Sequence, residues 1–174
     1  MVILETPRLA LRALDMEDAP ELQAVFSDPE VMLFMEGTRD LTATRAWLAR
    51  HIAFYRTRGC GVWGVVLTGS ADLAGYCGLI PQEVEGREEL EIGYLLARRH
   101  WHRGYATEAA AACRDLAFAR FGAPRVISLI APANAASIAV ARRMGMTCRQ
   151  EIEKWDRRIE VYALDRPAEL GEAR

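Results

Sequence analysis

The chain has 174 residues, of which 51% are hydrophobic and 26% are charged, and its formal net charge at pH 7 is −2. A chain of this length buries about two thirds of its unfolded surface, so one ordinary domain can be stable without disulfides or metals. The composition excludes a disordered or fibrous protein, and the near-zero charge argues against a strongly basic nucleic-acid-binding protein. The longest uncharged run, residues 126–141, is shorter than the roughly 18 apolar residues of a membrane span. We therefore expect a soluble globular protein.

The cysteine and histidine patterns predict neither a disulfide framework nor a metal site. The four cysteines lie far apart with no CxxC pair, and the three histidines have no carboxylate or cysteine at ligand spacing. The first eight residues lack the basic stretch and long apolar core of a secretory signal. We therefore expect a cytoplasmic protein with reduced thiols and no bound metal.

Hydrophobic periodicity and turn residues divide the chain into strands and helices. The first strand is expected at residues 9–14, and Asp15 can cap a following helix at 16–26. A second helix is expected at 41–58. The remaining expected elements are strands at 62–67, 72–80 and 89–96, a helix at 105–121, a strand at 126–130, a helix from Asn134 to 144, and a hairpin of strands at 147–155 and 159–165.

This order, β-α-α-β-β-β-α-β-α-β-β, predicts one mixed α/β (α+β) domain with seven strands and four helices. The charged segment 82–88 is expected to be a connection, and the last hairpin is expected to turn at Asp156 and Arg157. The polar tail from Pro167 is expected to fray. No linker or repeat divides the chain, so residues 1–174 are expected to form a single domain.

The segment 89–108 contains a strand, a basic turn and the start of a helix. The free amides at a helix start suit a phosphate group, and Gly104 lets a ligand approach the backbone. The side chains of Arg98, Arg99 and Arg103 could pair with phosphate oxygens. Neither GxxxxGK nor GxGxxG is present, so the fingerprints of nucleotide hydrolysis and dinucleotide binding are missing. A plain helix start with solvated arginines would show the same pattern.

A second polar pair, Asn134 and Ser137, lies at the start of the next helix. The two residues are three apart, so they share one helical face and could border a cleft beside the phosphate site. Asn is also among the best N-cap residues, and Gly145 is a normal helix stop, so a purely structural role fits equally.

Several short motifs occur in an order and spacing that together are specific. They are Thr6-Pro-Arg-Leu-Ala-Leu-Arg12, Asp28-Pro-Glu-Val-Met32, Glu91-Ile-Gly-Tyr94, Trp101-His-Arg-Gly-Tyr-Ala-Thr-Glu-Ala109, Asn134-Ala-Ala-Ser137 and Met144-Gly-Met146. With these motifs, nearly the whole chain resembles the GNAT superfamily of acetyl-CoA-dependent N-acetyltransferases. Within it, the chain is similar to the branch of enzymes that acetylate the N-termini of ribosomal proteins.

The resemblance implies a mixed, mostly antiparallel sheet that opens between the strands at 89–96 and 126–130, with acetyl-CoA in the gap. The pantetheine arm would bond to the backbone of Tyr94, Leu95 and Leu96. Asn134 would contact the arm, and Ser137 would lie near the thioester sulfur. The pyrophosphate would sit on the backbone amides of the turn into the next helix, those of His102, Arg103, Gly104, Tyr105, Ala106 and Thr107.

The chain departs from the superfamily pattern at four positions. Trp101 stands where the pyrophosphate motif often begins with Gln or Arg, and His102 stands where closer relatives often have Gly. Because the backbone makes the phosphate bonds, we expect binding to survive both changes. Other branches place a catalytic Glu at the position of Leu129 and an acidic Tyr at that of Ala141, so their catalytic pair is absent here.

The strand at 89–96 offers carboxylates that could take the proton from an attacking amine. Glu89 and Glu91 share one face of this strand. We predict Glu91 as the general base, acting through a water, with Glu89 as the reserve candidate. Both could instead be solvated on an exposed face. The amide of Tyr94 could stabilise the oxyanion, and Ser137 could protonate the leaving thiolate, although a thiol with a pKa near 8.5 needs little help.

The sequence leaves the amine acceptor open among a protein N-terminus, an aminoglycoside, a polyamine and a small metabolite. In the family the connection at 31–37 walls the acceptor site, though its apolar residues also suit an ordinary core. The acidic stretch at 83–91 could attract a cationic substrate or could simply be solvated. A non-catalytic acyl-CoA-binding or interaction module on the same fold is the alternative function. Exposed edge strands leave a homodimer open.

Overall fold

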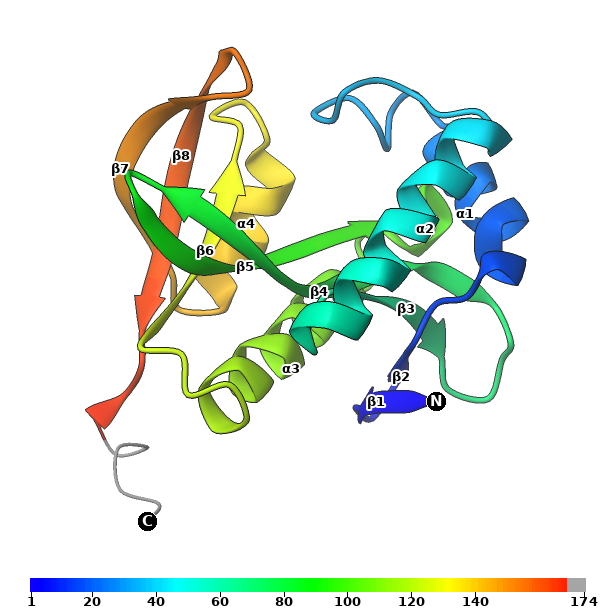
Figure 1. Cartoon of the computed structure of the whole chain (residues 1–174), viewed down its shortest axis with the longest axis horizontal. Coiled ribbons are helices and arrows are strands. Elements are labelled where there is room, and N and C mark those ends of the chain that lie inside the picture. Colours follow the sequence, from blue (N-terminus) through cyan, green and yellow to red (C-terminus); the bar gives the residue numbers. More distant parts are fainter. Residues whose placement is uncertain (169–174) are drawn as a thin grey trace.

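The computed structural model describes residues 1–168, and their eight strands form one sheet in the order β1-β2-β3-β4-β5-β6-β8-β7 (Figure 1). Neighbouring strands are antiparallel except β5 and β6, which are parallel. The strands are β1 (Val2–Glu5), β2 (Leu9–Arg12), β3 (Val62–Leu67), β4 (Leu73–Val84), β5 (Arg87–Leu96), β6 (Arg125–Ile130), β7 (Thr147–Lys154) and β8 (Arg157–Asp165). The helices are α1 (Ala19–Phe26), α2 (Leu41–Arg58), α3 (Tyr105–Ala119) and α4 (Ala135–Arg143), with short 3-10 helices η1 (Met16–Asp18) and η2 (Arg98–His100). A mixed, mostly antiparallel sheet with four α-helices confirms the predicted fold class.

The described residues contain one strand more than the seven predicted, because Val2–Glu5 forms β1 at the edge of the sheet. Leu4 pairs with Leu11 of β2, and Glu5 pairs with Ala10. The two ends of β1 are exposed and its two middle residues are only partly buried. The segment therefore lacks the strict alternation that marks a half-buried strand in a sequence.

Two hairpins turn more tightly than the sequence predicted. The charged segment 82–88 is not a loop, because β4 runs on and meets β5 across a two-residue turn at Glu85 and Gly86, with φ of 50° and 75°. The last hairpin turns at Trp155 and Asp156, with φ of 55° and 56°, one residue earlier than expected. Positive φ at both central residues is typical of type I′ turns, whose twist matches that of paired strands.

The helix predicted at 16–26 begins as η1 and continues as α1. Asp15 caps it, as predicted, by accepting a hydrogen bond from the backbone N–H of Glu17 at 2.8 Å. No helix among the described residues is long and apolar enough to cross a membrane. The tail from Pro167 was predicted to fray, and residues 169–174 of this tail lie outside the described residues.

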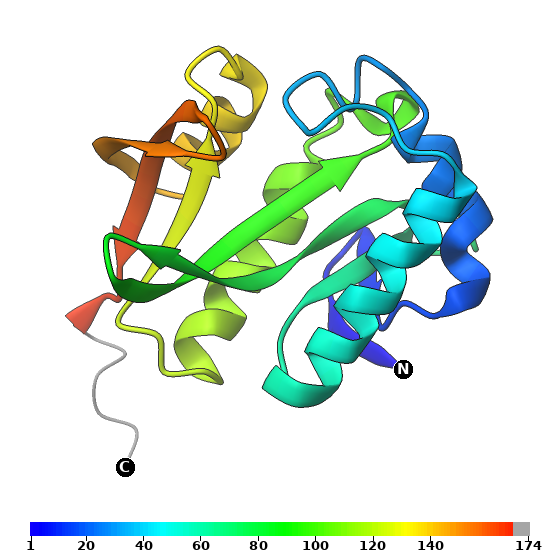
Figure 2. The same cartoon turned by 45° about the horizontal axis from the view of Figure 1, so that its top comes forward.

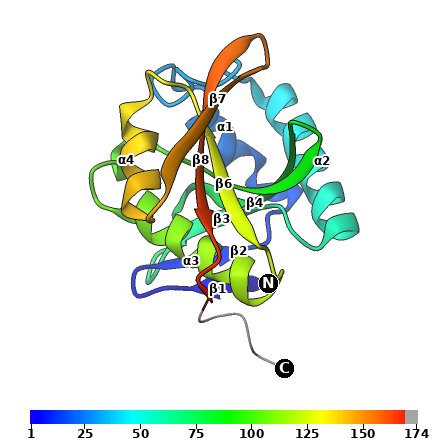
Figure 3. The same ribbon diagram turned by 90° about the vertical axis from the view of Figure 1, so that its left-hand side faces the viewer.

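Helices cover both faces of the sheet (Figure 3). On one face, α3 and α4 pack against the strands, and the small side chains of Ala109 and Cys113 in α3 are fully buried there. On the other face, α1 and α2 bury Phe26 and Leu48. The small residues at helical spacing on α3 thus form the stripe that faces the sheet.

β5 and β6 pair only near the start of β6. Leu90 pairs with Val126, the next residue of each strand also pairs, and Ser128 Oγ donates a hydrogen bond to the Ile92 carbonyl at 3.0 Å. Beyond Ile92, β5 stays paired with β4 but not with β6, and the two strands diverge (Figure 2). The sheet therefore opens between the two strands where the resemblance implied.

Candidate active site

A cavity of about 500 Å³ lies where β5 and β6 separate. Residues of both strands line it, together with residues of the α1–α2 loop, α2, α4 and the β7–β8 hairpin. Glu91, Tyr94 and Leu95 reach it from β5, and Asn134 and Ser137 reach it from the start of α4. The structure thus brings the predicted base and the predicted acid to one cavity with three of the predicted cofactor contacts. The loop at 31–37 lines it as well, as expected of an acceptor wall.

Glu91 is half-buried in the cavity wall. Gln82 Nε2 donates a hydrogen bond to Glu91 Oε2 at 2.7 Å. Burial raises the pKa of Glu91 to about 7, against the opposing effects of Gln82, a backbone hydrogen bond at Leu129 and the charge of Lys154. A carboxyl with this pKa is partly ionised at neutral pH, which suits a general base.

Glu89, the reserve candidate, has a different environment from Glu91. Its side chain is buried and forms two hydrogen bonds with Arg125, at 2.5 Å and 2.9 Å. It does not line the cavity, and both of its oxygens are engaged. The alternative in which both glutamates are solvated on an exposed face is therefore wrong, because one is ion-paired and the other faces the cavity.

Asn134 and Ser137 connect α4 to β5. Asn134 Oδ1 accepts a hydrogen bond from the backbone N–H of Ser137 at 3.1 Å, so Asn134 is the N-cap of α4. The hydroxyl of Tyr94 donates to the Ser137 carbonyl at 3.0 Å. Both contacts use the backbone of Ser137, and its hydroxyl has no partner among residues 1–168. That hydroxyl is therefore free to act on a ligand.

The turn at 102–107 presents backbone amides at the start of α3. Gly104 is the N-cap, with φ of 78°, and no side chain caps the first turn. The first amides of the helix therefore lack intrahelical or capping partners. His102 also has a left-handed backbone, with φ of 59°, a conformation that glycine adopts without strain.

Trp101 has a structural role that its sequence position did not reveal. Its indole Nε1 donates a hydrogen bond to the carbonyl of Leu96 at 2.8 Å. Of the three β5 residues expected to bond a pantetheine arm, Leu96 therefore has its carbonyl already engaged. Trp101 fixes the turn against the end of β5.

Glu108 anchors this turn to the N-terminal motif. Glu108 Oε1 accepts hydrogen bonds from Thr6 Oγ1 at 2.7 Å and from the Arg8 backbone at 3.0 Å, and Oε2 accepts from Arg8 Nε at 2.6 Å. Arg8 Nη1 also donates to the Arg103 carbonyl at 3.0 Å. Burial acts to raise the pKa of Glu108, but the hydrogen bonds from Thr6 and Arg8 outweigh it, so the pKa is lowered. No local pattern marks this role of Glu108, because its partners Thr6 and Arg8 lie in the first motif and Glu108 itself lies in the fourth.

If the turn at 102–107 holds the pyrophosphate as the resemblance implies, replacing Glu108 with alanine is expected to weaken acetyl-CoA binding by about tenfold, because the three hydrogen bonds that join the start of α3 to Thr6 and Arg8 are lost. Isothermal titration calorimetry measures the change in Kd. Asp115→Ala, an exposed change on the same helix that touches only Arg114, is the matched control. Equal affinity in the Glu108 variant and the control would show that the anchor does not position the amides.

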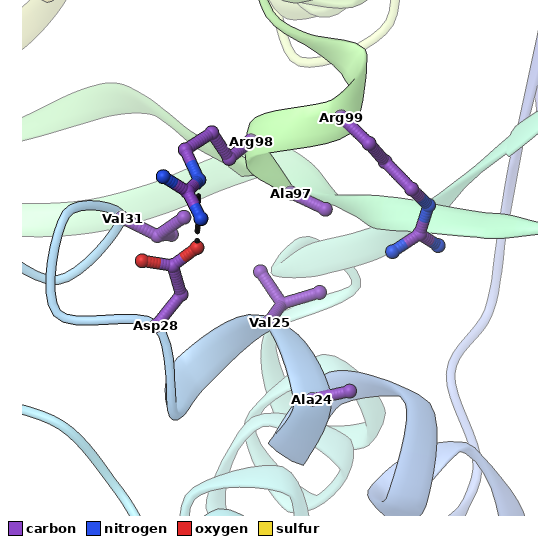
Figure 4. A pocket seen from close by; sticks show the side chains of 7 residues that line it. All are labelled: Ala24, Val25, Asp28, Val31, Ala97, Arg98 and Arg99. Atoms are coloured by element: carbon purple, nitrogen blue, oxygen red, sulfur yellow. Dashed lines mark ion pairs between the residues drawn. The ribbon is translucent and has the colours of Figure 1, made fainter.

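Arg98 and Arg99 are not poised to bind phosphate. Arg98 pairs with Asp28 at 3.2 Å and with Glu30 at 2.5 Å, and Arg99 pairs with Asp72 at 2.7 Å. Figure 4 shows both arginines at a second hollow, which they share with residues of α1 and the loop after it. The suggested contacts of these two side chains to phosphate are therefore replaced by ion pairs within the protein. The partners are distant in sequence, so no local pattern marks them.

Comparison with known proteins assigns the family. Residues 8–147 match the family model described as an acetyltransferase (GNAT) domain. The chain belongs to the GNAT acetyltransferase family. It is 38% identical over 160 residues to the uncharacterized protein YkkB of Bacillus subtilis (strain 168), covering 91% of this chain and 93% of that protein.

Solved structures of GNAT enzymes share this fold. The crystal structure of the acetyltransferase from Agrobacterium tumefaciens str. C58 is 31% identical, with a TM-score of 0.83 over 95% of each chain. A RimL ribosomal L7/L12 alpha-N-protein acetyltransferase, solved in complex with coenzyme A, is 20% identical, with a TM-score of 0.80 over 95% of this chain and 98% of that one. The likeness to RimL concerns the fold alone.

The protein is a GNAT N-acetyltransferase, and enzymes of this family take the acetyl group from acetyl-CoA. By the resemblance to the superfamily, Leu129 and Ala141 stand where other branches are expected to have their catalytic pair. Leu129 lines the cavity without a carboxyl group, and Ala141 is fully buried in the core. In this GNAT member the cavity carboxyl at the gap comes instead from Glu91 on the opposite strand.

The raised pKa of Glu91 predicts a pH-dependent effect on stability. In the unfolded chain this carboxyl ionises near 4.5, and in the folded protein near 7, so the folded state binds the extra proton between these values. The contribution of Glu91 to stability is therefore complete below pH 4.5 and is lost as pH rises to 7.

The difference in the free energy of unfolding between Glu91→Gln and the unmodified protein is expected to favour the variant more at pH 8 than at pH 4.5, by up to about 3 kcal/mol. Urea unfolding of both proteins at the two pH values measures this difference, since all other groups are shared. A stability difference between the two proteins that does not change with pH would contradict the raised pKa.

Proposed function

We propose that the chain, as a single N-acetyltransferase domain over residues 1–174, transfers the acetyl group of acetyl-CoA to a primary amine. The amine attacks the thioester directly in a ternary complex, and it belongs to a protein N-terminus or to a small molecule. The observation that carries this proposal is the Glu91 carboxyl, with a pKa of about 7, in the cavity where β5 and β6 separate.

The free edge of β5 and the start of α3 fit acetyl-CoA. Beyond Ile92 the β5 backbone has no strand partner on the β6 side, so the backbone of Tyr94, which faces that side as Ile92 does, can bond a pantetheine arm, whereas the Leu95 carbonyl faces β4. The uncapped amides of residues 102–107 lie at the positive end of the helix dipole, which favours a pyrophosphate. Asn134, at the cavity, is proposed to contact the arm.

Acetyl-CoA supplies a thioester that an uncharged amine can attack. Glu91 accepts the proton of the amine through a water, and an α-amine with a pKa of roughly 7.7–8.0 gives it up readily to a carboxylate of this basicity. The backbone N–H of Tyr94 stabilises the developing oxyanion. Ser137, whose hydroxyl is unengaged, donates a proton to the departing thiolate.

The proposal is tested by binding and by turnover. Acetyl-CoA at a hundredfold excess over Kd should stabilise the protein by about 2.7 kcal/mol, which raises Tm by about 5–10 °C. Free thiol should then appear only when a primary amine is added, and mass spectrometry should find the acetylated amine. Stabilisation without amine-dependent thiol release would support the non-catalytic acyl-CoA-binding module instead. No stabilisation at millimolar acetyl-CoA would contradict both functions.

A further inference from the structure

Three arginines line the cavity from three different segments. Arg39 lies in the loop before α2, Arg50 lies on α2, and Arg157 is the first residue of β8. The acidic residues that line it are Glu91, at the β5–β6 gap, and Glu36. The whole chain has a net charge of −2, whereas the cavity lining holds more arginines than glutamates.

Arg39 is held in place but is not neutralised. Its guanidinium carbon lies 5.4 Å from the ring centre of Phe26 and 6.0 Å from that of Trp47. Its closest carboxylate oxygen belongs to Glu36, at 3.8 Å, and the Glu36 side chain is 77% exposed, so this pair is weak. Arg39 Nη1 is shielded from solvent and has no hydrogen-bond partner among residues 1–168.

Arg157 also lines the cavity, from the β7–β8 hairpin. Its Nη1 donates a hydrogen bond to the Phe34 carbonyl at 2.8 Å, which joins the β7–β8 hairpin to the α1–α2 loop. Its Nε is shielded and lacks a partner within the described part of the chain. Both side chains line the cavity, and neither guanidinium has a carboxylate closer than 3.8 Å among the described residues, so both can pair with a ligand that supplies oxygen atoms.

The remaining groups at this end of the cavity do not offset the positive charge. Arg50 is exposed and forms no ion pair with a described residue. Burial, followed by the charges of Arg50 and Arg39, lowers the pKa of His51 to about 4, so this ring is neutral at pH 7. Guanidinium groups match the geometry of carboxylates and phosphates, and they repel polycations.

We propose that the acceptor of this enzyme is an amine that also carries an oxyanion, a carboxylate or a phosphate, which Arg39 and Arg157 bind while the amine faces Glu91. The inference rests on the proposed acetyl transfer to a primary amine. It selects among acceptors that the sequence left open, because polyamines and aminoglycosides bring only positive charge to a cavity that already holds three arginines.

Matched pairs of amines test the proposal. The pairs are alanine with alaninamide, O-phosphoethanolamine with ethanolamine, and the amidated dipeptide Ala-Asp with amidated Ala-Asn. They separate a free carboxylate, a phosphate and an acidic residue next to an N-terminus. In at least one pair the anionic amine is expected to have a kcat/KM at least about tenfold higher, expressed per unprotonated amine. Spermidine and kanamycin are expected to be poor acceptors.

Charge-removing variants locate the recognition. Arg39→Gln and Arg157→Gln are each expected to reduce, by about tenfold, the ratio of kcat/KM for the anionic amine to kcat/KM for its uncharged partner. Arg50→Gln, an exposed change that removes no packing, should reduce the preference by less. Arg45→Gln, on the same helix and outside the cavity lining, is the matched control and should leave it unchanged.

The failure of this inference differs from the failure of the proposed function. Equal or better turnover of the uncharged amines, of spermidine or of kanamycin would overturn the oxyanion requirement while acetyl transfer stands. A preference that persists unchanged in the Arg39 and Arg157 variants would overturn the assignment to these residues. Stabilisation by acetyl-CoA with no turnover of any amine would overturn the enzymatic function, and the inference with it.

Discussion

Replacing Glu91 with glutamine is expected to lower kcat by about 10²-fold or more, because the amide keeps the size of the side chain but cannot accept a proton. The affinity for acetyl-CoA should stay unchanged, since the proposed donor contacts are backbone groups of β5 and of residues 102–107 together with Asn134, and none of them is the Glu91 carboxyl. Steady-state thiol release at pH 7 and calorimetric titration with acetyl-CoA measure the two quantities separately.

Glu83→Gln provides the control, because Glu83 lies on the neighbouring strand β4 and is exposed outside the cavity. It should retain full turnover. A kcat of Glu91→Gln within about threefold of the unmodified protein would remove Glu91 from the mechanism, because proton transfer by a positioned side chain contributes far more than this. Turnover would then depend on solvent alone as the base.

Replacing Gly75 with alanine is expected to destabilise the protein by about 4 kcal/mol and to lower Tm by roughly 10 °C. A Cβ at Gly75 would lie 2.1 Å from the Leu95 carbonyl oxygen and 2.9 Å from the Leu96 Cα, and the backbone φ there is 144°. Both contacts are with the backbone of β5, so relief requires that this strand shift. The same segment carries the proposed pantetheine contacts, and acetyl-CoA binding should weaken as well.

Gly69→Ala separates the clash from the backbone strain. Gly69 also has a positive φ, of 78°, but a Cβ there would have no atom within 4 Å. Its substitution should cost only the roughly 1 kcal/mol of a left-handed alanine. Equal melting temperatures for the two variants would show that β5 does not approach β4 as closely as the structure has it.

Much of the fold is encoded in local patterns. The α4 helix begins after Asn134 because a cap acts within its own turn, and the buried stripe of α3 follows from small residues at helical spacing. The edge strand β1 and the turn at Glu85 and Gly86 were missed. The first is exposed at its ends and lacks alternation, and the second lies within a charged run that reads as a loop.

The site was less predictable, because its decisive contacts join distant segments. Glu89 and Glu91 stand on one strand face, and only the presence of Arg125 beside Glu89 distinguishes an ion pair from a cavity carboxyl. Arg39 and Arg157 likewise lie far apart in the sequence but line one cavity. Neither has a local pattern that marks it as a ligand-binding residue.

A crystal structure of the protein with coenzyme A bound would show whether the β5–β6 gap holds the cofactor. We expect the pantetheine arm along β5 beside Tyr94 and Leu95, the pyrophosphate on the amides of residues 102–107, and the thiol beside Ser137 in the cavity that contains Glu91. Coenzyme A seated elsewhere, for example with its phosphates at the hollow beside Arg98, would contradict the assignment of the β5–β6 gap as the active site.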